Sequence, residues 1–363
     1  MKVPLLRPTL PPLAEYVRAL EGVWETGILS NFGPHARSFE HIASEYLGVR
    51  HALAISSCDV GLLSTLRALR LRAGGECIAP SFTFNSTINA VLWNSLRPKF
   101  ADVEADTFNL DPDCVSEALG PETQCIVATH VFGNPCNVEA LDQIASDKGI
   151  PLVFDAAHAY GSLRRGRKVG NYGTAEVFSF SGTKVVTSGE GGLVSTSDAE
   201  LARRIELVRA YGFKDDYDSK ITGINGKISE MNAALGTLTL PRIEQVLRTR
   251  LALVERYKSS LSGIPRLGFQ AVERGDRSTY KDFALLVGSE RDALFEHMER
   301  SGIQCKKYFR PVHTMTYMEK RSVDLPITDD LASRVICIPL WNDMERNTQD
   351  YVIASIHEFY GND

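Results

Sequence analysis

Short apolar runs alternate with segments of helical period over the first two thirds of the chain, and this alternation restricts the fold more than any other feature. Runs of this kind, mostly apolar and only a few residues long, are typical of strands buried on both faces. Strands that alternate with helices form a mainly parallel sheet covered by helices, so we predict an α/β fold with a large three-layer domain. The predicted strands are residues 52–56, 76–80, 125–129, 152–155, 177–180 and 193–195, and the predicted helices include residues 60–71, 88–92 and one capped by Asn137 and closed by Gly149.

The pattern changes after about residue 240. Residues 241–261 form a long charged segment of helical period, and further strands and helices follow. We therefore predict a large domain over residues 1–240 and a smaller C-terminal α/β domain over residues 241–363. The elements expected there are strands at 283–287 and 335–340, a helix at 290–301 with Ser289 as its N-cap and Gly302 after its end, and a last helix at 347–360.

Composition and charge exclude several classes of protein. A formal net charge of −5 argues against a nucleic-acid-binding protein, which needs a basic face. No apolar run approaches the roughly 18 residues of a membrane span, and prolines interrupt the N-terminus where a signal peptide would be apolar. The seven cysteines are irregularly spaced without a Cys-x-x-Cys pair, which argues against a zinc site or a disulfide framework. We expect reduced thiols, no metal and a cytoplasmic protein.

Two charged residues stand at the carboxyl ends of predicted strands. Asp155 ends the strand at 152–155, and Lys184 follows the strand at 177–180 in a segment rich in serine and glycine. Ligands of open α/β sheets bind at the carboxyl ends of the strands, so we expect both side chains at one ligand site. Taken alone, each has an ordinary explanation, as a solvated lysine and as an aspartate that caps a turn.

Pyridoxal phosphate is the cofactor that needs a lysine, a carboxylate and a phosphate cradle together. The lysine forms the Schiff base, and the carboxylate keeps the pyridine nitrogen protonated so that the ring accepts electrons. The phosphate binds hydroxyls and free backbone N–H groups at the start of a helix. Candidates for these contacts are the segment Ser56-Ser57-Cys58-Asp59 and the hydroxyls of Ser179 and Ser181, with Phe84 or His158 against the ring.

Several short motifs accompany these residues. They are Thr26-Gly27 with Phe39-Glu40, Pro80-Ser81-Phe82-Thr83-Phe84, Asp155-Ala156-Ala157-His158, Phe178-Ser179-Phe180 with Thr183-Lys184, Gly189-Glu190-Gly191-Gly192, the run Gly-Ile-Asn-Gly-Lys-Ile-Ser-Glu at 223–230, and Ile338-Pro339-Leu340. Through them the chain resembles the DegT/StrS family of nucleotide-sugar aminotransferases from about Leu13 to Leu340. The resemblance implies the aspartate-aminotransferase fold (fold type I) and pyridoxal phosphate as cofactor, with pyridoxamine phosphate formed in the half-reaction.

The resemblance also implies roles for residues around the cofactor ring. Lys184 matches the Schiff-base lysine, which also moves the proton between the two carbons. Asp155 matches the carboxylate paired with the pyridine nitrogen. His158 stands where the family places glutamine or histidine beside the ring, and Phe84 where it places a stacking aromatic residue.

Further matches concern the phosphate and the partner subunit. Ser179 matches a phosphate ligand, and Ser57 and Cys58 match positions whose backbone N–H groups meet the phosphate. Asn225 matches an asparagine that reaches the phosphate of the neighbouring subunit, which implies a homodimer with shared active sites. The positions that match the lining of the substrate cleft are Lys227 and His313.

One segment departs from the family pattern. The family usually reads Ser-Gly-Thr where this chain has Ser57-Cys58-Asp59. Asp59 cannot donate a hydroxyl, and its charge would repel the phosphate, so we expect a weaker hold on the cofactor. We expect Asp59 instead to cap a helix that begins at Val60. Lys184 also excludes the sugar 3-dehydratases of this fold, which carry histidine at that position.

The resemblance implies transfer of an amino group from L-glutamate to a dTDP- or UDP-linked 4-keto-6-deoxy sugar, giving an amino sugar and 2-oxoglutarate. Residues 11–16 and 131–138 resemble the branch that makes dTDP-4-amino-4,6-dideoxyglucose, so amination at C4 is favoured over C3. The product would enter surface-polysaccharide (O-antigen) or secondary-metabolite synthesis. Alternatives are a C3 aminotransferase, a dehydratase or decarboxylase on the same fold, and a cofactor-binding regulator without turnover. A nicotinamide enzyme is disfavoured because no Gly-x-Gly-x-x-Gly follows a predicted strand.

Overall fold

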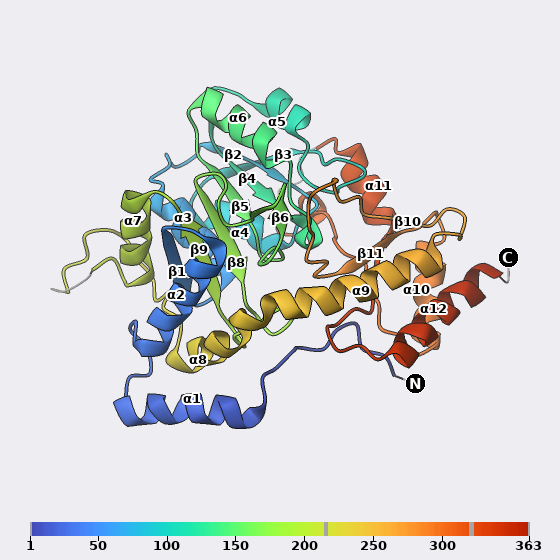
Figure 1. Ribbon diagram of the computed structural model, residues 1–363. Helices are drawn as coiled ribbons and strands as arrows, with labels where there is room; N and C mark the ends of the chain where they lie inside the picture. Colours follow the sequence, from blue (N-terminus) through green and yellow to red (C-terminus); the bar gives the residue numbers. More distant parts are fainter. Residues whose placement is uncertain (1, 214–216, 319–322, 362–363) are drawn as a thin grey trace.

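A mainly parallel mixed sheet forms the centre of the molecule (Figure 1). The computed structural model describes residues 2–213, 217–318 and 323–361, and within them this sheet has seven strands in the order β1-β9-β8-β5-β4-β2-β3. Pairing is parallel from β8 through β5, β4 and β2 to β3, and antiparallel where β9 joins β8 and β1. The strands are β1 (His51–Ile55), β2 (Glu76–Pro80), β3 (Arg97–Ala101), β4 (Thr123–Thr129), β5 (Leu152–Asp155), β8 (Ala175–Ser179) and β9 (Gly192–Thr196).

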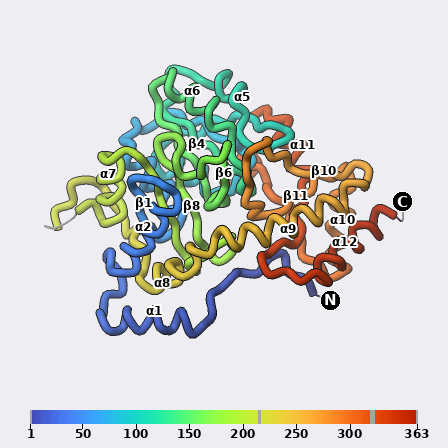
Figure 2. Tube along the Cα trace, viewed as in Figure 1, coloured from blue at the N-terminus to red at the C-terminus, as the bar shows by residue number. Residues whose placement is uncertain are grey.

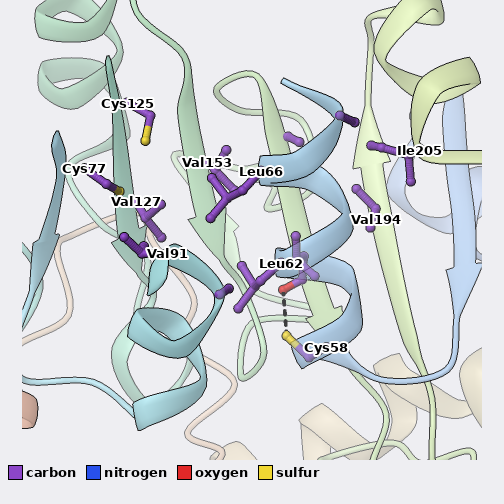
Figure 3. Close-up of a cluster of buried hydrophobic side chains, with 14 of the residues drawn as sticks. Cys58, Leu62, Leu66, Cys77, Val91, Cys125, Val127, Val153, Val194 and Ile205 are labelled. Atoms are coloured by element: carbon purple, nitrogen blue, oxygen red, sulfur yellow. Dashed lines mark hydrogen bonds between the residues drawn. The ribbon is translucent and has the colours of Figure 1, made fainter. Parts of the chain in front are cut away.

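Helices cover both faces of this sheet, as predicted for a three-layer α/β domain. On one face lie α3 (Cys58–Ala68), α4 (Asn85–Trp93) and α7 (Ala199–Arg209), whose apolar side chains pack on the strands (Figure 3). On the other face lie α2 (Pro34–Leu47), α5 (Pro112–Ala118), α6 (Val138–Lys148) and α8 (Glu230–Thr239). Neighbouring strand residues such as Val177 and Phe178 are both buried, on opposite faces, which explains the nearly continuous apolar runs.

The C-terminal part has its own three-stranded antiparallel sheet and core within the described residues. Its elements are α9 (Ile243–Leu261), β10 (Gly268–Phe269), β11 (Phe283–Leu286), α10 (Arg291–Arg300), α11 (Pro326–Arg334), β12 (Val335–Ile338) and α12 (Arg346–Gly361). The first residues of the chain run back to this part, where Val3 pairs with Ile303 (Figure 2). The division of the chain near residue 240 stays a prediction.

The remaining elements are short or lie at the periphery. Helix α1 lies along the bottom of Figure 1 and contacts α8, where the hydroxyl of Tyr16 donates to the carbonyl of Met231. These elements are α1 (Leu13–Thr26), the hairpin strands β6 (Leu163–Arg164) and β7 (Arg167–Lys168), and short 3₁₀ helices at Val131–Gly133, Leu240–Arg242 and Val312–Thr314.

The boundaries agree with the sequence where capping chemistry is clear. Asn137 accepts a hydrogen bond from the N–H of Ala140 and begins α6, and Gly149 ends it in the left-handed conformation, as predicted. The prediction for Ser289 was wrong, because Glu290 precedes α10 without a side-chain cap. Strand β3 was missed, since its sequence Arg-Pro-Lys-Phe-Ala suits an exposed edge strand and carries no continuous apolar signal.

Two further expectations concern cysteines and membranes. All seven cysteines are free thiols, and every one except Cys114 is buried. Among the helices of residues 2–213, 217–318 and 323–361, none is long and apolar enough to cross a membrane.

Candidate active site

Lys184 and Asp155 line one cavity at the carboxyl ends of β5 and β8. The two strands are neighbours, with Asp155 opposite Val177. Lys184 follows β8 in a turn in which its backbone N–H donates to the carbonyl of Ser181, at 3.0 Å. The cavity has a volume of about 230 Å³. The parallel pairing therefore brings together two side chains that are far apart in the sequence.

The environment of Lys184 increases the fraction of its amine that is neutral. Burial in the cavity lowers the pKa of Lys184 to about 8, and the positive charge of Lys281 acts in the same direction. Negative charge on Asp282 and Asp155 opposes the effect without cancelling it. With this pKa, about a tenth of the amine is neutral at pH 7, against far less for a free lysine side chain. The structure thus provides a lysine that can take up a proton.

Asp155 is held by a donor at each oxygen. The hydroxyl of Thr87 donates to Oδ2 at 2.7 Å, and the backbone N–H of Ala157 donates to Oδ1 at 3.0 Å. Burial raises the pKa of Asp155, while both hydrogen bonds and the charge of Lys184 work against this rise. An ionised carboxylate has about four acceptor positions, so capacity remains for a group in the cavity.

The N-terminus of α3 opens onto the same cavity. Ser57 is the N-cap, and its hydroxyl accepts from the N–H of Val60 at 3.2 Å. The N–H of Gly61 donates to the carbonyl of Ser57. Because the first turn of a helix leaves its N–H groups without intrahelical acceptors, those of Cys58 and Asp59 remain for an anion.

The expectation that Asp59 caps this helix was wrong. Helix α3 begins at Cys58 instead of Val60, so the cap position falls to Ser57. Asp59 lies in the first turn, where a negative charge favours the helix dipole, and it lines the cavity. Its repulsion of a bound phosphate stays a prediction.

Gly192 allows the sheet to approach this helix start closely. A Cβ atom at Gly192 would lie 2.7 Å from the carbonyl carbon of Ser57 and 2.8 Å from the nitrogen of Cys58. Both contacts are to backbone, which cannot move aside as a flexible side chain can. Within the glycine-rich segment 189–192, Gly192 therefore has a steric function at the helix start.

Two aromatic side chains face the cavity from different loops. Nδ1 of His158 is buried and, within the described residues, has no hydrogen-bond partner. Burial, followed by the charges of Lys184 and Lys281, lowers the pKa of His158 well below its usual value, so the ring is neutral. Phe84 lines the cavity with 57% of its surface exposed. Such an open apolar ring suits a flat ligand.

Seven of the predicted site residues line this one cavity, and three lie elsewhere. The seven are Ser57, Cys58, Phe84, Asp155, His158, Ser179 and Lys184. Asn225 and Lys227 line a second, wider cavity with Arg209 and Tyr211, where the ammonium of Lys227 lies 4.0 Å from the ring centre of Tyr211. His313 bonds to the hydroxyl of Ser81 at 2.8 Å and lines neither cavity. The roles predicted for all ten residues stay predictions.

Sequence reasoning missed a buried ion pair and two threonines. Nζ of Lys281 lies 3.0 Å from both carboxylate oxygens of Asp282, and both side chains line the cavity. Adjacent opposite charges directly before an apolar strand are the signal that could have revealed this pair. Thr83, in the loop before α4, and Thr87, in the first turn of α4, are hydrogen-bonded to each other and lie behind Asp155.

These features fit pyridoxal phosphate. An unpartnered imidazole nitrogen, an open aromatic ring, a buried carboxylate, a lysine of lowered pKa and a helix N-terminus all face one cavity. Gly192 allows the backbone of the sheet to lie against the start of α3 with no side chain between them. Lys184, Asp155 and the start of α3 would hold the cofactor. Across the described ranges, no three His, Cys, Asp or Glu residues group as a metal site would require.

Comparison with known proteins gives relatives along nearly the whole chain. The sequence model of the DegT/DnrJ/EryC1/StrS aminotransferase family matches residues 13–357. A protein of Escherichia coli named dTDP-4-amino-4,6-dideoxy-D-glucose transaminase is 34% identical over 354 residues, 94% of each chain. A protein of the same name from Shigella dysenteriae is 32% identical over 359 residues, 97% of each chain.

Solved structures have the same fold. The crystal structure of DesI in the presence of its TDP-sugar product superimposes with a TM-score of 0.91 at 34% identity, covering 98% of this chain and 92% of DesI. DesV of S. venezuelae, in complex with a ketimine intermediate, has a TM-score of 0.92 at 29% identity, covering 97% of this chain and 99% of DesV.

Proposed function

We propose a reaction for this chain on the premise that it belongs to the DegT/DnrJ/EryC1/StrS aminotransferase family and is thus a sugar aminotransferase that depends on pyridoxal phosphate. The proposed reaction transfers an amino group from L-glutamate to C4 of a nucleotide-linked 4-keto-6-deoxy sugar. The products are 2-oxoglutarate and the 4-amino sugar. The observation that carries the proposal is the pairing of Lys184 and Asp155 in one cavity at the start of α3. We favour dTDP over UDP as the nucleotide.

Lys184 performs the proton transfers. Bound in this cavity, pyridoxal phosphate supplies an electron-accepting ring that stabilises negative charge on the carbon that loses its proton. The amine of Lys184 takes the proton from the α-carbon of the amino donor and delivers a proton to the sugar carbon that receives nitrogen. A pKa of about 8 suits both directions, because the same group must act as base and then as acid near neutral pH.

The other cavity residues would hold and orient the cofactor. The bonds from Thr87 and Ala157 favour the ionised form of Asp155 against the effect of burial, and its carboxylate would keep a proton on the ring nitrogen of the bound cofactor. Free N–H groups of Cys58 and Asp59 bind the phosphate. Phe84 and His158 enclose the ring and exclude water. Each of these residues fixes a geometry in which Lys184 can reach the reacting carbon.

The choice of acceptor rests on relatives. Two curated proteins that resemble this chain along most of their length are named dTDP-4-amino-4,6-dideoxy-D-glucose transaminases, and DesI was solved with a TDP-sugar product. We therefore place the ketone at C4. Amination at C3 of a 3-keto-6-deoxy sugar is the second candidate. We place the reaction in the cytoplasm, where free thiols stay reduced, and its product in polysaccharide or secondary-metabolite synthesis.

We also infer that the active unit is a homodimer. One face of α1 exposes Leu13, Val17 and Trp24, with 75%, 45% and 70% of their surfaces accessible. These residues recur at helical spacing, and apolar faces of this kind mark protein interfaces. Asn225 is exposed in the wider cavity, where it can reach a partner. Trp24→Glu is expected to shift the mass measured by light scattering from dimer towards monomer.

An isotope experiment tests the reaction and its position together. Holoenzyme is incubated with nitrogen-15 L-glutamate and, separately, 3-keto and 4-keto 6-deoxy sugars linked to dTDP or UDP. We expect the label in the product from dTDP-4-keto-6-deoxyglucose, with nitrogen–carbon coupling at C4. Label at C3 supports the second candidate, and no label in any sugar contradicts the proposal. Lys184→Ala is the control and should give no labelled sugar.

A further inference from the structure

A chain of three threonine hydroxyls ends on the carboxylate of Asp155. The hydroxyl of Thr87 is 2.7 Å from Oδ2 of Asp155, that of Thr83 is 2.8 Å from Thr87, and that of Thr129 is 3.0 Å from Thr83. All four side chains are buried. They come from separate segments: the loop after β2, helix α4, and the last residues of β4 and β5.

In this series of hydrogen bonds, the carboxylate at one end decides which group donates and which accepts in every bond. An ionised carboxylate only accepts, so Thr87 must donate to Asp155. Each hydroxyl has one proton, so Thr87 must accept from Thr83, and Thr83 in turn from Thr129. Hydrogen bonds aligned in this way polarise one another. Each of the three hydroxyls therefore directs its proton along the series towards the carboxylate.

We propose that Thr87, Thr83 and Thr129 are positioning residues that keep the Asp155 carboxylate ionised and aimed at the ring nitrogen of the cofactor. The inference rests on the proposed function only in assigning Asp155 to that nitrogen. With the cofactor bound, the carboxylate and the ring nitrogen would share one proton. A carboxylate that receives fewer hydrogen bonds holds this proton more strongly, so the nitrogen holds it less. The electron-accepting power of the ring then falls.

Other charged and titratable groups near Asp155 give no equivalent support. The charge of Lys184 favours the ionised form, while that of Asp59 disfavours it. The thiol of Cys58, a weak donor, lies 3.9 Å from Oδ1 and 3.6 Å from the carbonyl oxygen of Val177, so the carbonyl is its nearer acceptor (Figure 3). Among the described residues, the hydrogen bond to Oδ2 of Asp155 comes from the hydroxyl of Thr87.

Packing alone does not explain these bonds. Thr65, in α3 on the same face of the sheet, is equally buried, yet its hydroxyl has no hydrogen-bond partner among residues 2–213, 217–318 and 323–361. The core thus accommodates a threonine without using its hydroxyl. Thr65→Val is a matched control, because it makes the same change of hydroxyl to methyl away from Asp155.

The experiment compares holoenzyme variants by nitrogen-15 NMR of cofactor labelled at the ring nitrogen. Thr87→Val should shift the signal towards the unprotonated position at constant pH, and Thr83→Val should do so to a smaller extent. Turnover of Thr87→Val should fall about ten- to a hundredfold, the effect of losing one hydrogen bond to a charged group. Thr87→Ser should restore both signal and turnover, and Thr65→Val should change neither.

Two results would overturn the inference. One is an unchanged ring-nitrogen signal in Thr87→Val that binds cofactor normally. The other is an equal shift in Thr65→Val, which would indicate general loosening of the core. If Thr87→Val does not fold, Thr83→Val takes its place in this test. A shifted signal in a protein that does not aminate any sugar would reject the proposed function and leave this inference standing.

Discussion

The hydroxyl of Thr87 lies 2.7 Å from Oδ2 of Asp155, although the two residues are 68 positions apart in the sequence. This bond joins helix α4 to the end of strand β5. Together with the N–H of Ala157 at Oδ1, it fixes the carboxylate on both oxygens. Both carboxylate oxygens of Asp155 are therefore held by donors from this part of the fold.

Replacing Asp155 tests the importance of this fixed charge. Asp155→Asn is expected to lower kcat by roughly 10²–10³-fold, as removal of one preorganised electrostatic group does in other enzymes. Its amide would also turn a donor towards Thr87 or the N–H of Ala157. Steady-state kinetics with L-glutamate measures the loss. Asp59→Asn is the matched control and should bind cofactor more tightly, because it removes charge beside the phosphate. Normal turnover in Asp155→Asn would refute the role proposed for the Asp155 carboxylate.

Lys184 should destabilise the cofactor-free protein in a pH-dependent way. A lysine in the unfolded chain has a pKa near 10.5, and the cavity lowers that of Lys184 to about 8. Between these values the unfolded chain binds a proton that the folded protein does not, so stability rises with pH. Lys184→Met should therefore raise the free energy of unfolding most below pH 8, and this gain should vanish as pH rises towards 10.5.

Urea unfolding of both cofactor-free proteins across that range provides the measurement. Lys148→Met, at the exposed end of α6, is the control for removal of a lysine charge outside the cavity. A Lys184→Met difference that does not change with pH would show that Lys184 is an ordinary solvated lysine.

Gly192 should tolerate no side chain. Gly192→Ala places a Cβ against the backbone of Ser57 and Cys58, so the start of α3 must move, at a cost of about 1–3 kcal/mol in stability. The N–H groups of Cys58 and Asp59, which we propose bind the phosphate, would move with it. We expect at least roughly tenfold weaker cofactor binding in absorbance titrations, because a loss of about 1.4 kcal/mol in binding free energy lowers affinity tenfold. Gly263→Ala, with nothing within 4 Å, is the control; equal affinities of the two variants would contradict this account.

The cysteines should be largely unreactive in the native protein. Burial raises the pKa of Cys58, Cys136 and Cys337 well above its usual value, so their thiolates are scarce as well as inaccessible. Cys114 is only partly buried. A thiol reagent should modify Cys114 first, and the remaining thiols only on unfolding, as peptide mapping would show. Rapid labelling of Cys58 in the native holoenzyme would be inconsistent with this structure.

The sheet and most of the cavity were predictable because their signals are local. Buried strands are apolar on both faces, and polar residues such as Asp155 stand out where such a strand ends. The spacing of Asn137 and Gly149 likewise sets the ends of α6. Confirmation of the DegT-type fold shows that these local patterns agree with the global arrangement.

What the sequence did not reveal depends on contacts between distant segments. The direction of the Thr83 side chain matters only because β4 and α4 meet behind Asp155. Lys281 reaches the cavity from the C-terminal part, across more than ninety residues from Lys184. The start of α3 was misplaced by two residues because both Ser57 and Asp59 are good N-cap residues, and the close approach of Gly192 is not visible locally.

The most direct test of the account is the visible absorbance of purified holoenzyme during the two half-reactions. We predict that the band of the bound cofactor fades when L-glutamate is added alone, and returns when dTDP-4-keto-6-deoxyglucose follows. Lys184→Ala reconstituted with the cofactor should show neither change. A wild-type band that L-glutamate leaves unchanged would contradict the account, because it would mean that the Lys184 and Asp155 site does not accept the proposed amino donor.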